Sequence, residues 1–176
     1  MTERDDNIIK KVQSGDTEAY AELVRRHHQS ILRLCRSMLG GGADAEDAAQ
    51  ESFIKAYRSL AGYQGQASFS TWIYRIASNK CLDVLRKRGR ERAEPLEAAG
   101  ELAEPVEDLE SREQAAALLS ELSPEYRLAL TLRELQGFTY EEIAETMNCS
   151  LDSVKARLRR ARAELARHFL VSRSVQ

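Results

Sequence analysis

The sequence predicts an all-α protein of two small helical domains joined by a flexible acidic linker. Apolar residues recur at three- and four-residue spacings through most of the 176 residues, and no useful length alternates as a strand does. The three prolines all lie beyond residue 94, so nothing interrupts helices in the first half. After Gly89 the composition changes abruptly to Glu, Ala, Gly and Pro. We therefore predict a first domain at 1–90, a linker at 91–111 and a second domain at 112–176.

Three helices are predicted in the first domain. The first spans 16–39 and stops at three glycines, and the second spans 44–60. Their apolar positions are expected to be core: Tyr20, Leu23, Val24, Ile31, Leu34, Cys35, Leu39, Ala49, Phe53, Ala56, Tyr57 and Leu60. The third helix begins at Ser68, after the turn-forming letters GYQGQ, and runs into a cluster of basic residues.

The third helix presents two different faces. One is apolar and is expected to be core: Phe69, Ile73, Ile76, Ala77 and Val84. Another carries a stripe formed by Arg75, Asn79, Leu82 and Arg86. An amide can bond a base edge while flanking guanidinium groups hold phosphates. The alternative is a solvated stripe beside a buried Trp72, but Asn79 followed by the letters RKRGRER favours nucleic acid.

A net charge of -2 hides two basic blocks separated by an acidic one. Residues 75–90 carry six basic residues and one acid, and residues 151–170 carry six and two. Residues 91–110 carry eight acids and one basic residue, a net charge of -7. The total charge argues against a wholly basic nucleic-acid coat, whereas the distribution favours two localised contacts.

The second domain is predicted to contain helices at 111–122 and 123–137, followed by two more. Ser123 can cap the second of these helices, and Gly137 suits a left-handed exit. The next helix begins with Thr139 and Glu142, which have the spacing of a capping box.

The last two predicted helices have the spacing of a helix-turn-helix. One should end near Met147 and the other should start at Ser150, with Asn148 tolerating a left-handed turn conformation. Val154 would anchor the second helix to the first. Its other face is basic: Lys155, Arg157, Arg159, Arg160 and Arg162. A charge run alone is usually a solvated surface, but the caps, the turn and the one-sided charge together favour DNA recognition.

Other classes of site find no support in the residue pattern. Cys35, Cys81 and Cys149 are far apart and lack metal-ligand spacing, which argues against a disulfide framework or a zinc site. No catalytic constellation or glycine phosphate loop occurs, so we expect no enzyme activity, no metal and no cofactor. No signal segment or apolar span is evident, so a cytoplasmic protein without direct membrane insertion is expected.

The motifs resemble those of a bacterial RNA polymerase sigma factor of the sigma-70 family, in the extracytoplasmic-function group that keeps only regions two and four. The resemblance covers nearly the whole chain and rests on these stretches: GDTEAYAELV, DAEDAAQESFIKAYRSL, FSTWIYRIASN, LSPEYRLALTLRELQGFTYEEIAETMNCS and SVKARLRRARAEL. It implies a promoter-recognition subunit, with region two at 1–90, region four at 112–176 and the acidic linker in the RNA channel of the polymerase.

The resemblance also implies three sets of functional residues. Core polymerase would be bound by Asp44, Asp47, Gln50, Glu51 and Ile54. The melted minus-ten strand, with a flipped base, would be held by Tyr63, Arg75, Asn79, Arg86, Lys87 and Arg88. The minus-thirty-five duplex would be contacted by Arg133, Ser153, Lys155, Ala156, Arg157, Arg159, Arg160 and Arg162.

One departure from the family pattern affects promoter choice. Where many members begin the recognition helix with Pro-Val-Gly-Thr, this chain has Ser150-Leu151-Asp152-Ser153. Asp152 either complements the helix dipole or accepts a hydrogen bond from a cytosine, and both interpretations stay open.

The resemblance further implies a stress or envelope-response regulon and control by an anti-sigma factor. A one-component helix-turn-helix regulator with an N-terminal helical regulatory domain is the serious alternative. It would bind palindromic duplex without polymerase, whereas a sigma factor needs the core enzyme. A structural helical adaptor ranks third, since it leaves both basic blocks unexplained.

Overall fold

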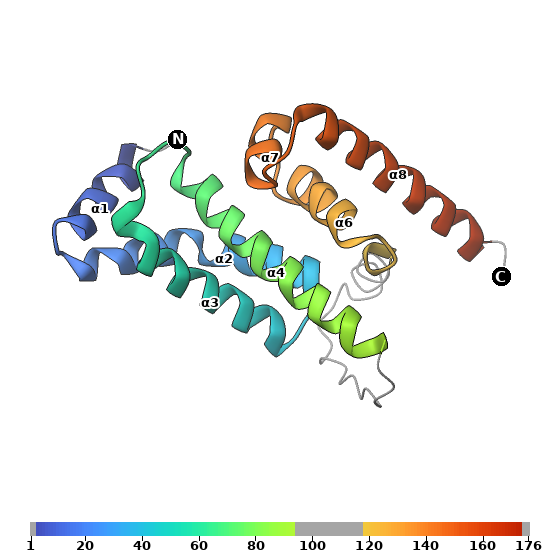
Figure 1. Ribbon diagram of the computed structural model, residues 1–176, viewed down its shortest axis with the longest axis horizontal. Helices are drawn as coiled ribbons and strands as arrows, with labels where there is room; N and C mark the ends of the chain where they lie inside the picture. Colours follow the sequence, from blue (N-terminus) through green and yellow to red (C-terminus); the bar gives the residue numbers. More distant parts are fainter. Residues whose placement is uncertain (1–2, 94–117, 174–176) are drawn as a thin grey trace.

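The computed structural model describes residues 3–93 and 118–173, and the ribbon is helical throughout these ranges (Figure 1). The elements, in chain order, are α1 (Glu3–Gln13), η1 (Thr17–Ala19), α2 (Tyr20–Leu39), α3 (Ala43–Ser59), η2 (Leu60–Gly62), α4 (Phe69–Ala93), α6 (Pro124–Leu130), η3 (Thr131–Leu135), α7 (Tyr140–Thr146) and α8 (Leu151–Arg173). The predicted all-α class is confirmed by this arrangement. α1 was not predicted.

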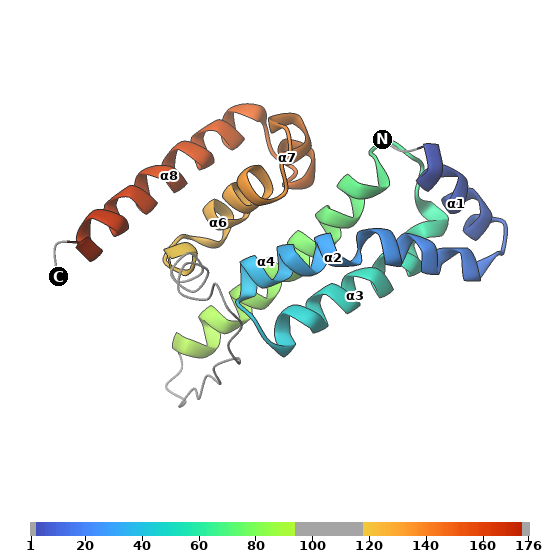
Figure 2. The ribbon, with the colours of Figure 1, turned by 180° about the vertical axis from the view of Figure 1, so that it is seen from behind.

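The first half of the chain is a bundle of α2, α3 and α4, with α1 at one end of it (Figure 2). The predicted apolar face of α4 is confirmed in the core, where Phe69, Ile73 and Ala77 are at most 2% exposed. Val84 is half-buried. Tyr57 corrects the prediction of a core residue, because it is 41% exposed and packs its ring against Tyr20 at the edge of the bundle.

The residues around the predicted domain boundary are helical. α4 continues through Gly89 to Ala93, beyond the predicted linker start at 91. Helical hydrogen bonds tolerate a single glycine at a cost of about 1 kcal/mol, so a glycine does not by itself end a helix. The rest of the predicted linker lies outside the described residues, as does most of the predicted helix at 111–122, of which 118–120 are helical.

Local capping explains where the helices of the second half begin and end. The Ser123 hydroxyl accepts the Tyr126 backbone N–H at the start of α6. The capping box predicted at Thr139 and Glu142 is present at the start of α7. Asn148 has a φ of 49° in the turn before α8, as its side-chain type predicts. The predicted helix at 123–137 consists of α6 and η3, a π-helical turn.

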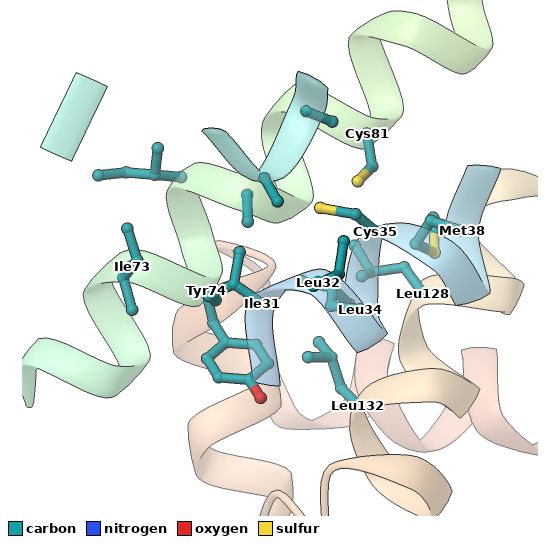
Figure 3. Packing of buried hydrophobic residues seen from close by; sticks show 14 of the residues in the cluster. Ile31, Leu32, Leu34, Cys35, Met38, Ile73, Tyr74, Cys81, Leu128 and Leu132 are labelled. Atoms are coloured by element: carbon teal, nitrogen blue, oxygen red, sulfur yellow. The ribbon is translucent and has the colours of Figure 1, made fainter. Parts of the chain in front are cut away.

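The two halves pack against each other through α6 and η3 on one side and α2 and α4 on the other. Leu128 and Leu132 meet the buried side chains of α2 in a hydrophobic cluster that runs through both halves (Figure 3). Tyr74 of α4 donates to the Gln136 side chain at 2.7 Å and packs on Phe138, with ring centroids 4.6 Å apart.

Arg127 is the charged residue at the centre of this interface. It is only 8% exposed, and its guanidinium donates to the Met38 carbonyl at 2.6 Å and to the Ser120 carbonyl at 2.7 Å. Burial lowers its pKa, and the nearby Arg88 lowers it further. Helix α2 leaves terminal carbonyls without helical partners, so Arg127 satisfies one of them from the other half of the chain.

Candidate nucleic-acid and polymerase interfaces

The α4 stripe, defined as Arg75, Asn79, Leu82 and Arg86, lies on the side of α4 that the bundle leaves open. Arg75, Asn79 and Arg86 are exposed, and Leu82 is half-buried. The Arg86 guanidinium lies 3.1 Å from the Asp83 carboxylate, in an exposed pair that contributes at most about 1 kcal/mol. Asn79 is therefore exposed on the stripe, with Arg75 before it and Arg86 after it in the helix.

Two basic residues of α4 are engaged by α2 and α3. Arg88 pairs with Asp44 and also donates to the Leu39 carbonyl at 3.0 Å. Lys80 pairs with Glu51. Sequence reasoning assigned Arg88 to DNA and Asp44 to polymerase, whereas in the structure they bond to each other. Both side chains are partly exposed, at 37% and 57%, so water screens the pair and exchange for another partner costs little.

Tyr63 lies in the loop between η2 and α4 and is held in place by aromatic contacts. Its ring centroid is 4.9 Å from that of Trp72, and its hydroxyl donates to the Ala67 carbonyl at 2.6 Å. Burial raises the pKa of the Tyr63 phenol, and the carboxylates of Asp6, Asp5 and Glu145 raise it further. The phenol therefore stays neutral at physiological pH. Trp72 is half-buried rather than buried.

The recognition helix α8 buries one face and exposes the other. Val154, Leu158 and Ala161 are at most 1% exposed and pack toward the rest of the second half. The predicted contacts that are exposed are Lys155, Arg159, Arg160 and Arg162, and those that are half-buried are Ser153, Ala156 and Arg157. This division matches the orientation that a helix needs when it enters a major groove.

Three basic side chains on the exposed face of α8 already have intramolecular partners. Arg162 pairs with Glu134 at 2.7 Å, and this carboxylate raises the pKa of the guanidinium. Lys155 lies 3.4 Å from Asp152, whose side chain is 94% exposed. Arg160 donates to the Tyr126 hydroxyl at 3.3 Å. The three basic side chains are exposed, so these contacts contribute little to stability.

Arg133 has a structural position that sequence reasoning did not anticipate. Its guanidinium donates to the Phe138 carbonyl at 2.8 Å and lies 5.2 Å from the centroid of the Tyr140 ring. It therefore supports the turn that leads into α7, at the edge of the helix-turn-helix.

A groove with a volume of about 1100 Å³ runs between α2 and α3. The predicted polymerase contacts Asp47, Gln50 and Ile54 line one side, and Ile54 is 45% exposed. Tyr57 continues the α3 side, and α2 contributes the other side with residues such as Val24 and His28, which sequence reasoning did not assign to this surface. The lining combines apolar side chains with the carboxylates of Glu18, Glu46 and Asp47 and the guanidinium of Arg25.

Cys35 and Cys81 are free thiols buried in the core. The Cys35 and Cys81 sulfur atoms point toward one another in the core (Figure 3), and hydrogen bonding to Cys35 together with burial raises the pKa of the Cys81 thiol. Residues 3–93 and 118–173 contain no cluster of three or more metal-ligand side chains. No helix within those ranges is long and apolar enough to cross a membrane.

The chain is similar to known proteins along most of its length. The family model for sigma-70 region 2 matches residues 23–91, and that for sigma-70, region 4 matches residues 112–165. The RNA polymerase sigma-H factor of Pseudomonas aeruginosa is 38% identical over 91% of each chain. The ECF RNA polymerase sigma-E factor of Escherichia coli K12 is 38% identical over 90% of each chain.

Two solved structures have the same fold. CnrH in complex with the cytosolic domain of CnrY has a TM-score of 0.73 at 25% identity, covering 93% of this chain and 96% of that one. The sigma factor RpoE in complex with the anti-sigma factor NepR, from Bartonella quintana, has a TM-score of 0.71 at 24% identity, covering 86% and 97%.

Proposed function

This chain belongs to the sigma-70 family as an extracytoplasmic-function RNA polymerase sigma factor, and we propose how its surfaces divide promoter recognition among them. A sigma factor is a transcription initiation factor, which directs core RNA polymerase to promoter DNA. The observation that supports the proposal is that one chain holds two helices whose exposed basic residues are arranged differently. α4 exposes a narrow stripe with an amide at its centre, and α8 exposes a wide basic face.

The minus-ten element is read as a single strand by α4 and the loop before it. A base can be recognised on its pairing edge only after it leaves the stack, which costs a few kcal/mol that a fitted pocket must offset. Asn79 supplies a donor and an acceptor, and Tyr63 supplies an aromatic wall. Cationic side chains hold the phosphates: Arg75, Arg86, Lys87 and, once it leaves Asp44, Arg88.

The minus-thirty-five element is read as duplex by α8. Lys155 and Arg157 are the base-reading candidates near the start of the helix, and Arg162 is a phosphate contact. Arg133 contacts the DNA backbone from beside the turn, where its bond to the Phe138 carbonyl holds it.

The groove between α2 and α3 binds core polymerase. Asp47, Gln50 and Ile54 lie at the groove, so apolar contact and charge complementarity act together there. Glu51 and Asp44 belong to the same surface and are paired with basic residues of α4. Binding of polymerase therefore competes with two ion pairs of the free chain.

Control by an anti-sigma factor is part of the proposal, and its support is the complex of RpoE with NepR, which shares the fold.

We also propose that the protein acts in the cytoplasm, on DNA, and has no enzyme activity of its own. Domain limits of 1–90, 91–111 and 112–176 are proposed for region two, the linker and region four.

Run-off transcription with purified core polymerase tests the function. Addition of this chain is expected to produce specific transcripts from a cognate promoter and none from core polymerase alone. Specific binding to palindromic duplex without polymerase, and no stimulated transcription, would favour the one-component regulator instead. The match to sigma-70 region 2 argues against that alternative, since it occupies the residues where a regulatory domain would lie.

A further inference from the structure

The last residue of α1 reaches across to the loop that carries Tyr63. The Gln13 side-chain amide donates to the Leu60 carbonyl at 2.9 Å and to the Tyr63 carbonyl at 3.1 Å. These acceptors lie 47 and 50 residues further along the chain. The NH₂ group of Gln13 therefore bonds to both ends of the short turn that links η2 to the loop.

The loop needs such support because its own backbone is irregular. It contains Gly65 in the left-handed region, with a φ of 70°, before α4 begins at Phe69. Fixing each backbone residue in one conformation costs roughly 1–2 kcal/mol of entropy. The Tyr63 hydroxyl fastens the far side of the loop to the Ala67 carbonyl. Gln13 bonds to the Tyr63 carbonyl, so hydrogen bonds hold both the backbone and the side chain of Tyr63.

Helix α1 is fixed to the bundle, so Gln13 at its end can support the loop that carries Tyr63. Ile9 is 3% exposed and packs into the core. Asp5 accepts from Arg26 and bonds to the His27 ring nitrogen, both at 2.9 Å. The His27 ring in turn packs on Phe69, with centroids 5.2 Å apart. A chain of contacts therefore runs from α1 through α2 to the start of α4, on either side of the loop.

We infer that Gln13 is a positioning residue, which orders the loop so that Tyr63 is presented to the unpaired promoter strand before DNA arrives. This inference rests on the proposed role of α4 and its loop in minus-ten binding. An ordered loop binds more tightly because less entropy is lost on association. α1 lies outside the residues matched by the family model, which begin at residue 23, so the model alone does not assign it this role.

A simpler role for the same two hydrogen bonds is to dock α1 on the bundle. The two roles differ in what changes when the donor is removed. If Gln13 only docks α1, its loss lowers the stability of the whole fold and affects every activity equally. If it positions the loop, its loss affects single-strand binding and the environment of Trp72, whose ring packs on Tyr63.

The test uses two substitutions that keep the size of the side chain and remove its donors, Gln13→Met and Gln13→Glu. Asn7→Met is the matched control, because Asn7 is also an exposed amide on α1. Holoenzymes made with each full-length chain are measured for affinity to a single-stranded minus-ten oligonucleotide and to upstream duplex. We expect single-strand affinity to fall about fivefold to tenfold, the scale of one or two neutral hydrogen bonds, with duplex affinity unchanged.

A spectroscopic measurement on the free chain provides a second readout. The sequence contains a single tryptophan, Trp72, so intrinsic fluorescence reports directly on its contact with Tyr63. Gln13→Met is expected to increase quenching of Trp72 by acrylamide, while far-ultraviolet circular dichroism and the thermal midpoint stay those of the parent. Asn7→Met is expected to change none of these values.

Asn79→Ala, measured in parallel, separates failure of the inference from failure of the proposed function. If Asn79→Ala weakens single-strand binding but Gln13→Met does not, the inference is overturned and the minus-ten surface stands. If neither weakens it, the minus-ten surface and the role of Gln13 both fall. A lower thermal midpoint for Gln13→Met, with single-strand and duplex binding reduced equally, would leave Gln13 as a docking residue only.

Discussion

α4 and α8 are both long helices with basic residues, yet the structure uses their charges differently. α4 is packed against α2 and α3 and also meets α6 and α7, so only a stripe of it stays open. Arg88 and Lys80 on its borders are engaged by carboxylates of α3. α8 packs mainly on α6 and α7 and exposes a broad face. The density of charge in a sequence therefore does not by itself indicate which residues are available to DNA.

The shape of each exposed surface suits a different form of DNA. A broad basic face on one helix fits the major groove of a duplex, where several phosphates and base edges are within reach together. A narrow stripe beside an aromatic loop fits one strand, in which a base has left the stack. The following predictions test the interface between the two halves, the two proposed DNA surfaces and the proposed polymerase surface. They are given in order of decreasing expected effect.

The largest effect is expected from Arg127→Met, which removes the charged contact between the two halves. It leaves the Met38 and Ser120 carbonyls without this donor, and each unsatisfied buried group costs about 1–3 kcal/mol. We expect the free energy of unfolding in urea to fall by about 2–4 kcal/mol. Arg159→Met on exposed α8 is the control and should change it by less than about 0.5 kcal/mol. Equal stability of both variants would contradict a structural role for Arg127.

Asn79→Ala is expected to act on the α4 surface alone. Loss of a base-edge contact costs about 1–3 kcal/mol, or roughly tenfold to hundredfold in affinity for single-stranded minus-ten DNA. Binding of holoenzyme to upstream duplex should stay near normal. A premelted bubble distinguishes two roles: if Asn79 captures a base, the transcription defect persists on the bubble, and we expect that it does. Full rescue by the bubble would assign Asn79 to duplex opening instead.

Substitutions in α8 should produce the opposite pattern. Lys155→Ala or Arg157→Ala should cost about 1–3 kcal/mol on cognate upstream duplex only, whereas Arg162→Ala should weaken all duplexes and reduce the salt slope by about one unit. Single-strand minus-ten binding should be unchanged in each case. Binding curves at several salt concentrations measure these differences. A uniform loss on every duplex for all the substitutions would rule out direct readout by α8.

Asp47→Lys is expected to weaken core polymerase binding by roughly tenfold, because it reverses a charge in the groove that is proposed to meet the polymerase. Glu51→Lys should have a smaller effect, since Glu51 is already paired with Lys80 in the free chain. Fluorescence titration with core polymerase gives the affinities, and circular dichroism checks the fold. Unchanged affinity for both variants would remove this surface from the polymerase interface.

Several features were predictable from the sequence because they depend on residues close together in the chain. The Ser123 cap, the capping box of Thr139 and Glu142, and the left-handed Asn148 are each decided within a few residues. The apolar face of α4 follows from helical periodicity in the same way. Local hydrogen bonding and sterics fix these elements wherever the helix is later packed.

Other features were decided only when the helices packed together. α1 was missed although its residues have helical spacing, because its position depends on Asp5 bonding to residues of α2 more than 20 positions away. Arg88 was assigned to DNA, but packing of α3 against α4 brings it to Asp44. Nothing in the sequence distinguishes Arg127 from an exposed helical arginine. Its burial depends on its bond to the Met38 carbonyl, which lies 89 residues earlier. A sequence specifies which side chains can form such bonds, whereas tertiary packing selects the partners, since distant residues meet only after the core has brought their helices together.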